Sequence, residues 1–405
     1  MESVTCVKVP QRYAQVYREH LQSAGVLDQR FCLQKQSDGT ISLPVLLSAL
    51  PKLDLMSLQR AVPPDSSYEL VQVQLSKKTK VKSQSDRIEE VMQKLLVSHG
   101  LHWDDHLTMD IPQSWQRHGD LILFGQGCFS NAIWKNLGTE MWSAVAGALG
   151  VKRLAQIKRI SADGFRTPVV TVLLGESSHV THTDNRIRYE FDISKCMFSF
   201  GNISEKLRIA SFNCKGETVV DLYAGIGYFT LPYLVHAGAA HVHACEWNPN
   251  AVEALHRNLQ LNGVSDHCTI HQGDNRQLAL CDLADRVNLG LIPSSEGGWP
   301  VACRLLKRKT GGILHIHHNV TSAPHHAHQT ASDTTDMEDE DNLPQRANRN
   351  AWEAWANDTA TFIAALLRDI TGGPWRTCIQ HIEKVKSYAP HVDHVVLDLE
   401  CRPDD

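Results

Sequence analysis

Short apolar, β-rich runs alternate with amphipathic helical runs over residues 188–401. The candidate strands are TVVDLYA, HVHACE, CTIHQGD, RVNLGLI, GILHIHH, WRTCIQHIEKV and HVDHVVLDLE, in that order. Such alternation is typical of a parallel sheet whose strands are joined by crossover helices. We therefore expect an α/β domain over residues 187–405.

The helix expected between the second and third of these runs has recognisable ends. Asn248 can cap its first turn, and Pro249 suits the first helical position because its fixed backbone needs no N–H partner there. Apolar residues at helical spacing then share one face until Gly263 ends the pattern. These signals place the turn after the second strand at the start of a helix.

Two smaller units are expected before this domain. Residues 1–75 combine a helical stretch with a short extended run, and residues 91–186 contain the strand-like LILFG and PVVTVLL around a helical stretch. Each pattern indicates a small α+β module. Residues 76–90 hold four lysines and one arginine in a polar, serine-rich stretch without an apolar face, which is typical of a basic linker.

Residues 321–350 interrupt the alternation. The motif HHAH is followed by six acidic residues between Asp333 and Asp341, with almost no aliphatic side chains. A segment of this kind buries too little apolar surface to offset the entropy lost on ordering. We therefore predict a disordered acidic insertion at the surface of the α/β domain.

The composition excludes several classes of protein. The chain has 405 residues, 42% hydrophobic and 21% charged, as in globular proteins of two or three domains. Neither an apolar run of ~18 residues nor a secretory signal is evident, so we expect no membrane span and no export. Eleven cysteines without a C-x-x-C pair indicate reduced thiols in the cytoplasm, without structural zinc or disulfides. With a net charge of −5, any polyanion must be bound by a local basic patch.

The strongest chemical signal is VVDLYAGIGYFT, a β-branched strand that runs through Asp221 into Gly225 and Gly227. In open α/β sheets ligands bind beyond the carboxyl ends of the strands, where glycines let the backbone approach them. The pattern is G-x-G and not the G-x-G-x-x-G of dinucleotide folds, which favours a cofactor without phosphates. For an isolated G-x-G, a simple tight turn remains the alternative.

Polar residues also end the next two strands. Glu246 ends HVHACE, where a carboxylate can accept both ribose hydroxyls of a nucleoside. Asp274 and Asn275 end the third strand, where an acid and an amide suit the exocyclic amine and a ring nitrogen of adenine. Any one of these residues alone is explained as a helix cap, but acidic residues at three successive strand ends indicate binding of an adenosine-type ligand.

These residues resemble the Rossmann-like class I transferases that use S-adenosyl-L-methionine, which have a seven-stranded, mostly parallel sheet. A narrower resemblance is to the wybutosine-synthesizing protein 2 family, the eukaryotic tRNA 3-amino-3-carboxypropyltransferases. It is carried by FDISKCMFSFGNISEKLRIA, VDLYAGIGYFTLPYLVHAGA, HACEWNPNAVEALHRNLQLNGV, GDNR and VKSYAPHVDHVVLDLEC, nearly continuously through the last two thirds of the chain. That family is related to the tRNA guanine-37 N1-methyltransferases.

The resemblance implies an activity. The family moves the 3-amino-3-carboxypropyl group of S-adenosylmethionine to C7 of 4-demethylwyosine, the modified guanosine at position 37 of tRNA(Phe), and releases 5′-methylthioadenosine. The implied partner is the anticodon stem-loop of that tRNA, and residues 91–186 are the expected tRNA-binding module. Neither a membrane nor a metal is implied.

The resemblance also implies the residues that contact the cofactor. Carried over by position, they are Ser199, Lys206, Glu246, Asp274 and Asn275. Asp221 and the loop at Gly225 match the first motif of the family. A lysine suits the α-carboxylate of the methionine arm, because its flexible stem can follow different poses. Without the resemblance, Lys206 reads as a solvated side chain beside Glu205.

The segment after the fourth strand departs from the related methyltransferases. The sequence has Asn-Leu-Gly-Leu-Ile-Pro-Ser-Ser from Asn288, where those enzymes usually have a shorter Asn-Leu-Pro. This difference argues against N1-methylation, which is the main alternative activity. Asn288, Pro293 and Ser294 are expected to line the base pocket, although a plain strand-to-helix loop also explains the stretch. No general base is identified.

Basic residues offer contacts for RNA. They occur at Lys77, Lys78, Lys80 and Lys82, then at Lys152, Arg153, Lys158 and Arg159, and at Lys384 and Lys386 before Tyr388. Contacts of lysine and arginine with phosphates make affinity depend on salt, and an exposed aromatic ring can stack on an unpaired base. A third hypothesis is a non-catalytic RNA-binding protein that retains the fold, although the intact glycine loop and strand-end acids argue against it.

Overall fold

The computed structural model describes residues 2–49, 68–76, 83–322 and 343–404. The chain forms two compact units, residues 1–83 and 84–405. Of the predicted basic linker 76–90, residues 77–82 lie outside the described residues, whereas residues 84–90 form the first turns of helix α3 (Gln84–Ser98), which corrects that part of the prediction. The acidic stretch 323–342 also lies outside the described residues. Within the part of the chain that the structure describes, no helix is long and apolar enough to cross a membrane.

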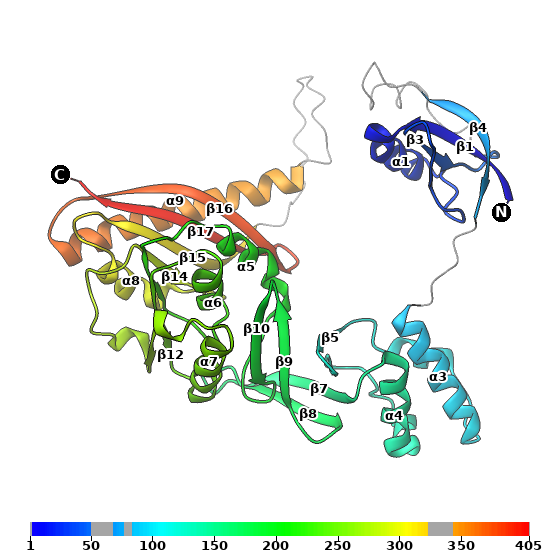
Figure 1. Ribbon diagram of the computed structural model, residues 1–405, viewed down its shortest axis with the longest axis horizontal. Helices are drawn as coiled ribbons and strands as arrows, with labels where there is room; N and C mark the ends of the chain where they lie inside the picture. Colours follow the sequence, from blue (N-terminus) through cyan, green and yellow to red (C-terminus); the bar gives the residue numbers. More distant parts are fainter. Residues whose placement is uncertain (1, 50–67, 77–82, 323–342, 405) are drawn as a thin grey trace, which may run out of the picture. The chain divides into compact units, whose positions relative to one another are not determined.

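Among its described residues, the first unit comprises a four-stranded antiparallel sheet and an α-helix that packs on it (Figure 1). Apolar side chains of the helix, including Tyr17 and Leu21, pack against Val7, Val9 and Leu43 of the sheet. The strands follow the order β2-β3-β1-β4, with bounds β1 Glu2–Pro10, β2 Gln34–Lys35, β3 Thr40–Pro44 and β4 Glu69–Leu75, and the helix is α1 Ala14–Ser23.

The second unit begins with two helices packed on a small sheet. Met92 and Leu96 of the first helix meet Phe124 of the sheet and Val145 of the second helix in one core. The helices are α3 Gln84–Ser98 and α4 Gly138–Leu149, and the sheet order is β5-β6-β7-β8, with β5 Trp115–His118, β6 Leu121–Phe124, β7 Arg153–Ile160 and β8 Pro168–Leu174.

A hairpin and a short helix lead into the α/β domain. The hairpin strands are β9 His179–Asp184 and β10 Ile187–Asp192, and the helix is α5 Ile203–Ala210. The backbone N–H of Glu190 in β10 donates to the side chain of Asn258 at 2.7 Å. This contact joins the hairpin to α7 (Pro249–Leu261), which carries Asn258.

The domain contains a seven-stranded sheet in the order β13-β12-β11-β14-β15-β17-β16. The first five strands are parallel and β17 is antiparallel to both its neighbours, which confirms the predicted fold class. Strand bounds are β11 Thr218–Asp221, β12 His241–Glu246, β13 Cys268–Gln272, β14 Arg286–Leu289, β15 Gly312–Thr321, β16 Trp375–Ala389 and β17 Val392–Pro403.

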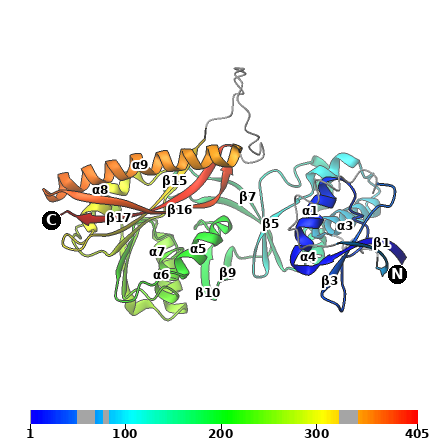
Figure 2. The ribbon, with the colours of Figure 1, turned by 90° about the horizontal axis from the view of Figure 1, so that it is seen from above.

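Helices cover both faces of this sheet (Figures 1 and 2). Because side chains alternate along a strand, Val219 packs with α6 and α7 on one face while Val220 packs with α8 and α9 on the other. Because both faces are covered, consecutive residues of β11, Val219 and Val220, are both apolar and fully buried. The helices are α6 Thr230–Val235, α7 Pro249–Leu261, α8 Trp299–Leu305 and α9 Leu343–Thr371.

Helix α9 corrects part of one prediction. It begins at Leu343, inside residues 321–350, where composition predicts disorder. The helix buries Ala356, Ile363 and Leu367 against the sheet and α8. Once these turns are packed, each further residue adds a hydrogen bond without a new nucleation cost, so the helix extends into the polar segment.

Candidate functional site

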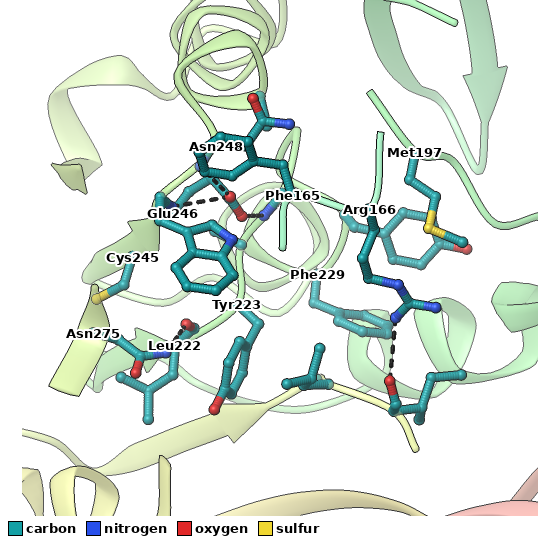
Figure 3. Close-up of a pocket in the computed structure, with 18 of the residues that line it drawn as sticks. Phe165, Arg166, Met197, Leu222, Tyr223, Phe229, Cys245, Glu246, Asn248 and Asn275 are labelled. Atoms are coloured by element: carbon teal, nitrogen blue, oxygen red, sulfur yellow. Dashed lines mark hydrogen bonds between the residues drawn. The ribbon is translucent and has the colours of Figure 1, made fainter. Parts of the chain in front are cut away.

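A cavity of about 490 Å³ opens at the carboxyl ends of β11, β12, β13 and β14 (Figure 3). This volume suits a nucleoside-sized ligand. Five of the seven residues predicted to contact the cofactor line it: Ser199, Gly225, Glu246, Asp274 and Asn275. Further lining residues come from the segment between β7 and β8, from the loop after β14 and from β16. Parallel strands bring these ends to one edge of the sheet, as the sequence predicts.

The glycine loop adopts a backbone that other residues rarely accept. Gly225 and Gly227 have φ values of 56° and 98°. A Cβ on Gly227 would lie 3.0 Å from Leu255 and 3.1 Å from Leu231, so the loop packs directly on the helices behind it. The G-x-G motif therefore makes a tight turn and also brings its backbone to the cavity. Both interpretations of the motif, a simple turn and a ligand-binding loop, fit this geometry.

Glu246 is the centre of the polar wall. Its carboxylate accepts backbone N–H groups of Gly225 at 2.8 Å, Trp247 at 3.0 Å and Asn248 at 2.8 Å. Burial raises the pKa of Glu246, and these three hydrogen bonds oppose that rise. A carboxylate offers about four acceptor positions, so roughly one stays open on Oε2 for a ligand hydroxyl.

Asp274 and Asn275 follow β13, the strand next to the one that ends at Glu246. Asp274 caps a short 3-10 helix, Asn275–Gln277, and forms a 2.6 Å ion pair with Arg276. Asn275 donates its side-chain N–H to the carbonyl of Leu222 at 2.7 Å, which fixes the orientation of its amide (Figure 3). The pair thus presents oriented acceptors at the place predicted for an adenine ring.

Asp221 lies behind the cavity and does not line it. Its carboxylate is fully buried and accepts hydrogen bonds from Thr230 at 2.8 Å and Asn288 at 3.0 Å. Burial raises the pKa of Asp221, and these hydrogen bonds oppose the shift. Its position joins β11, α6 and β14, so it holds the shape of the glycine loop.

Lys206 is also away from the cavity surface. Its buried amino group forms an ion pair with Asp184 of β9 and lies 4.5 Å from the ring centre of Tyr228. Burial lowers the pKa of Lys206, and the bond to Asp184 opposes the shift. Ser199 does line the cavity, and its carbonyl accepts a hydrogen bond from the Tyr228 hydroxyl.

The loop after β14 contributes residues other than those predicted. Gly290, Leu291 and Ile292 line the cavity, whereas Asn288 is buried against Asp221. Ser294 pairs with His318 of β15 in an isolated bridge. The loop therefore presents Leu291 and Ile292 to the cavity, while Asn288 and Ser294 face the sheet.

Sequence reasoning missed the segment between β7 and β8. Phe165 packs on Trp247 with ring centres 5.9 Å apart, and Arg166 donates to the carbonyl of Ile292 at 3.1 Å (Figure 3). An exposed aromatic residue beside a glycine was the only local signal, and it is common in loops. These contacts close one side of the cavity with residues that lie far along the chain from their partners, Arg166 being 126 positions from Ile292.

The fold and this cavity define a class I S-adenosylmethionine-dependent transferase. Comparison with known proteins narrows the class. The family model "TRM5/TYW2 methyltransferase domain" matches residues 180–336, and two models named "TYW2 N-terminal domain" match residues 6–80 and 92–178.

Relatives that match this chain over its whole length are named as wybutosine-synthesizing protein 2 homologues. "tRNA wybutosine-synthesizing protein 2 homolog" of Danio rerio is 64% identical over 407 residues and covers 100% of both chains. The homologue of that name from Homo sapiens is 50% identical over 426 residues, covering 99% of this chain and 95% of its own. The chain belongs to the wybutosine-synthesizing protein 2 family.

Solved structures agree with this assignment. P. horikoshii TYW2 in complex with MeSAdo is 26% identical, covers 78% of this chain and 99% of its own, and has a TM-score of 0.55. The M. jannaschii tRNA m1G37 methyltransferase is 20% identical, covers 99% of this chain and 100% of its own, and shares the fold with a TM-score of 0.54.

Proposed function

We propose that the chain transfers the 3-amino-3-carboxypropyl group of S-adenosylmethionine to C7 of 4-demethylwyosine at position 37 of tRNA(Phe), releasing 5′-methylthioadenosine. The observation that carries this proposal is a whole-length family relationship at 64% identity, together with a nucleoside-sized cavity at the strand ends. We place the reaction in the cytoplasm, as the reduced cysteines predict.

The reaction needs no nucleophilic residue from the protein. C7 of the base attacks Cγ of the methionine arm and forms the new carbon–carbon bond. The Cγ–S bond breaks, and its electron pair returns to the sulfonium, which leaves as the neutral thioether. C7 then loses its proton. Since the sulfonium is already electrophilic, the contribution of the protein is orientation, which can supply about 7 to 11 kcal/mol of the barrier reduction.

For the cofactor, the lining residues divide by the chemistry they offer. The carboxylate of Glu246 suits a ribose hydroxyl, and Asp274 with Asn275 suits the adenine edge. Ser199 borders the side of the cavity toward α5. Asp221 and Lys206 support the wall from behind, because their polar groups are already paired within the fold.

For the RNA, we propose that residues 91–186 and the edge strand β16 contact the anticodon stem-loop. Lys152, Lys158 and Arg159 are exposed, as a phosphate-binding surface requires. Tyr388 is 57% exposed at the cavity rim, where a ring can stack on an unpaired base. Binding through such groups weakens as salt rises.

Label transfer tests the activity. The protein is incubated with tRNA that carries 4-demethylwyosine and with cofactor labelled either in the methyl group or in the carboxyl group. We expect the carboxyl label in RNA and the methyl label in 5′-methylthioadenosine. A parallel reaction uses tRNA with an unmodified guanosine at position 37. Methyl label in either RNA would identify an N1-methyltransferase instead. Neither label in RNA would indicate a non-catalytic binding protein.

A further inference from the structure

Three cationic side chains line the cavity, and they differ in their partners. Arg276 is neutralised by Asp274 at 2.6 Å. Arg166 donates to the uncharged carbonyl of Ile292. Lys386, on β16, is half-buried, and none of the residues described by the structure forms an ion pair or hydrogen bond with it. Burial lowers the pKa of Lys386, with no carboxylate to oppose the shift. Its charge is available to an anionic ligand.

Asn202 places an unpaired acceptor in the same wall. It lines the cavity, is only 9% exposed, and its Oδ1 is buried without a hydrogen-bond partner among the described residues. Although it precedes α5, its side chain makes no capping hydrogen bond. Buried polar atoms in native proteins are nearly always paired, so an orphan at a cavity indicates a ligand donor.

Gly201 brings these two groups together. A Cβ on Gly201 would lie 2.6 Å from the Nζ atom of Lys386, so the amino group rests against the residue next to Asn202. The wall therefore contains a cation that rests against Gly201 and an unpaired acceptor on the next residue, Asn202. An α-amino acid has the matching pair, a carboxylate and an ammonium on one carbon.

We propose that Lys386 and Asn202 hold the amino-acid end of S-adenosylmethionine, with Lys386 donating to the α-carboxylate and Asn202 Oδ1 accepting from the α-ammonium. This assignment rests on the proposed function and deepens it. A phosphate of RNA is the less suitable ligand, because it has no donor for Asn202. Lys206, which the family resemblance assigns to the cofactor, already has Asp184 as its partner.

This placement has a consequence for the group transferred. Glu246 and Asn275 line the cavity at the strand ends, where they would hold the adenosine, while Lys386 would hold the far end of the arm from the edge strand. With both ends fixed, the chain between Cα and sulfur is restrained, and Cγ is presented to the base. A methyltransferase needs only the sulfonium methyl to be presented. Lys386 and Asn202 act here as positioning residues.

Three ligands separate the parts of this site by calorimetry in the absence of RNA. S-adenosylmethionine has the whole arm, its decarboxylated form keeps the ammonium, and 5′-methylthioadenosine lacks the arm. We expect Lys386→Met to weaken S-adenosylmethionine about 10- to 100-fold and to leave the other two unchanged. Asn202→Ala is expected to weaken the first two ligands but not 5′-methylthioadenosine.

Two further variants sharpen the test. Gly201→Ala should reproduce the effect of Lys386→Met, because the added methyl displaces the flexible amino group while the backbone tolerates alanine. Arg376→Met is the matched control, since Arg376 is an exposed cationic residue on the same strand, β16, and does not line the cavity. It should bind all three ligands like the parent protein.

Other results would overturn the assignment. If Lys386→Met weakened the binding of all three ligands equally, Lys386 would have a structural role. Unchanged cofactor affinity with weaker, less salt-dependent tRNA binding would show a phosphate contact instead. Transfer of methyl label to RNA by the parent protein refutes the proposed function alone, because the ligand comparison is made without RNA and still reports on the arm.

Discussion

The backbone N–H of Gly225 donates to Oε2 of Glu246 at 2.8 Å. This bond ties the loop after β11 to the residue that ends β12, two strands that are neighbours in the sheet. The other carboxylate oxygen accepts from Trp247 and Asn248 at the start of α7. One carboxylate thus organises the turns on both sides of the cavity before any ligand binds.

Replacement of Glu246 by alanine should weaken cofactor binding by about 1.5 to 3 kcal/mol, because charge-assisted hydrogen bonds are lost and the glycine loop loses its anchor. Calorimetry with S-adenosylmethionine measures the change. Glu253→Ala is the matched control, since Glu253 is exposed on α7 and forms a salt bridge with Arg257 of the same helix. Equal affinity of the two variants would contradict the site assignment.

Replacement of Lys206 by methionine should lower the free energy of unfolding by about 3 to 5 kcal/mol, because Asp184 is left as an uncompensated, largely buried charge. Urea denaturation measures the loss. Adding Asp184→Asn should restore part of it. Lys195→Met, which removes an exposed lysine 4.0 Å from Asp192, should have little effect. Full stability with a selective loss of cofactor affinity would instead support a direct cofactor contact by Lys206.

Stability should fall as the pH drops from 6.5 toward 4. Burial lowers the pKa of both His118 and His394 to about 4, so both are neutral in the folded state. A lowered histidine pKa means that the unfolded chain binds protons first, and the stability present above pH 6.5 is lost on acidification. Urea midpoints across this range measure the effect.

Glu205 acts in the opposite direction. Burial raises the pKa of Glu205 to about 7, with Arg208 opposing the shift, so its contribution is full below pH 4.5 and is lost as the pH rises through 7. The variant His118→Phe isolates the effect of the histidine on the pH dependence of stability. Phenylalanine keeps an aromatic ring in the contacts that His118 makes with Phe191 and Phe200 but cannot bind a proton. An unchanged pH dependence in this variant would refute the role of His118.

A chain that begins at Gln84 should bind the cofactor as the whole chain does. Residues 84–405 form a compact unit, and the cavity-lining residues lie between Gly164 and Tyr388. Calorimetry with S-adenosylmethionine compares the two chains, and circular dichroism checks that the shorter one folds. A folded shorter chain with clearly weaker binding would show that residues 1–83 contribute to the site.

Local pattern determined the sheet and the strand-end part of the site. Alternating apolar runs set the order of strands and helices, and in a parallel sheet residues such as Glu246 and Asn275 reach one edge wherever the strands pair. This is why the G-x-G loop, the acid after the second strand and the pair after the third were predictable from their neighbours in the chain.

Tertiary structure alone decided the partners of the long charged side chains and the distant walls of the cavity. Lys206 lies in the same short motif as Ser199, yet its amino group forms an ion pair with Asp184 of the hairpin. Lys386 lies far along the sequence, yet the edge strand carries it to Gly201. A flexible side chain pairs with whichever groups the fold brings within reach, and long-range packing sets those distances without a mark in local sequence.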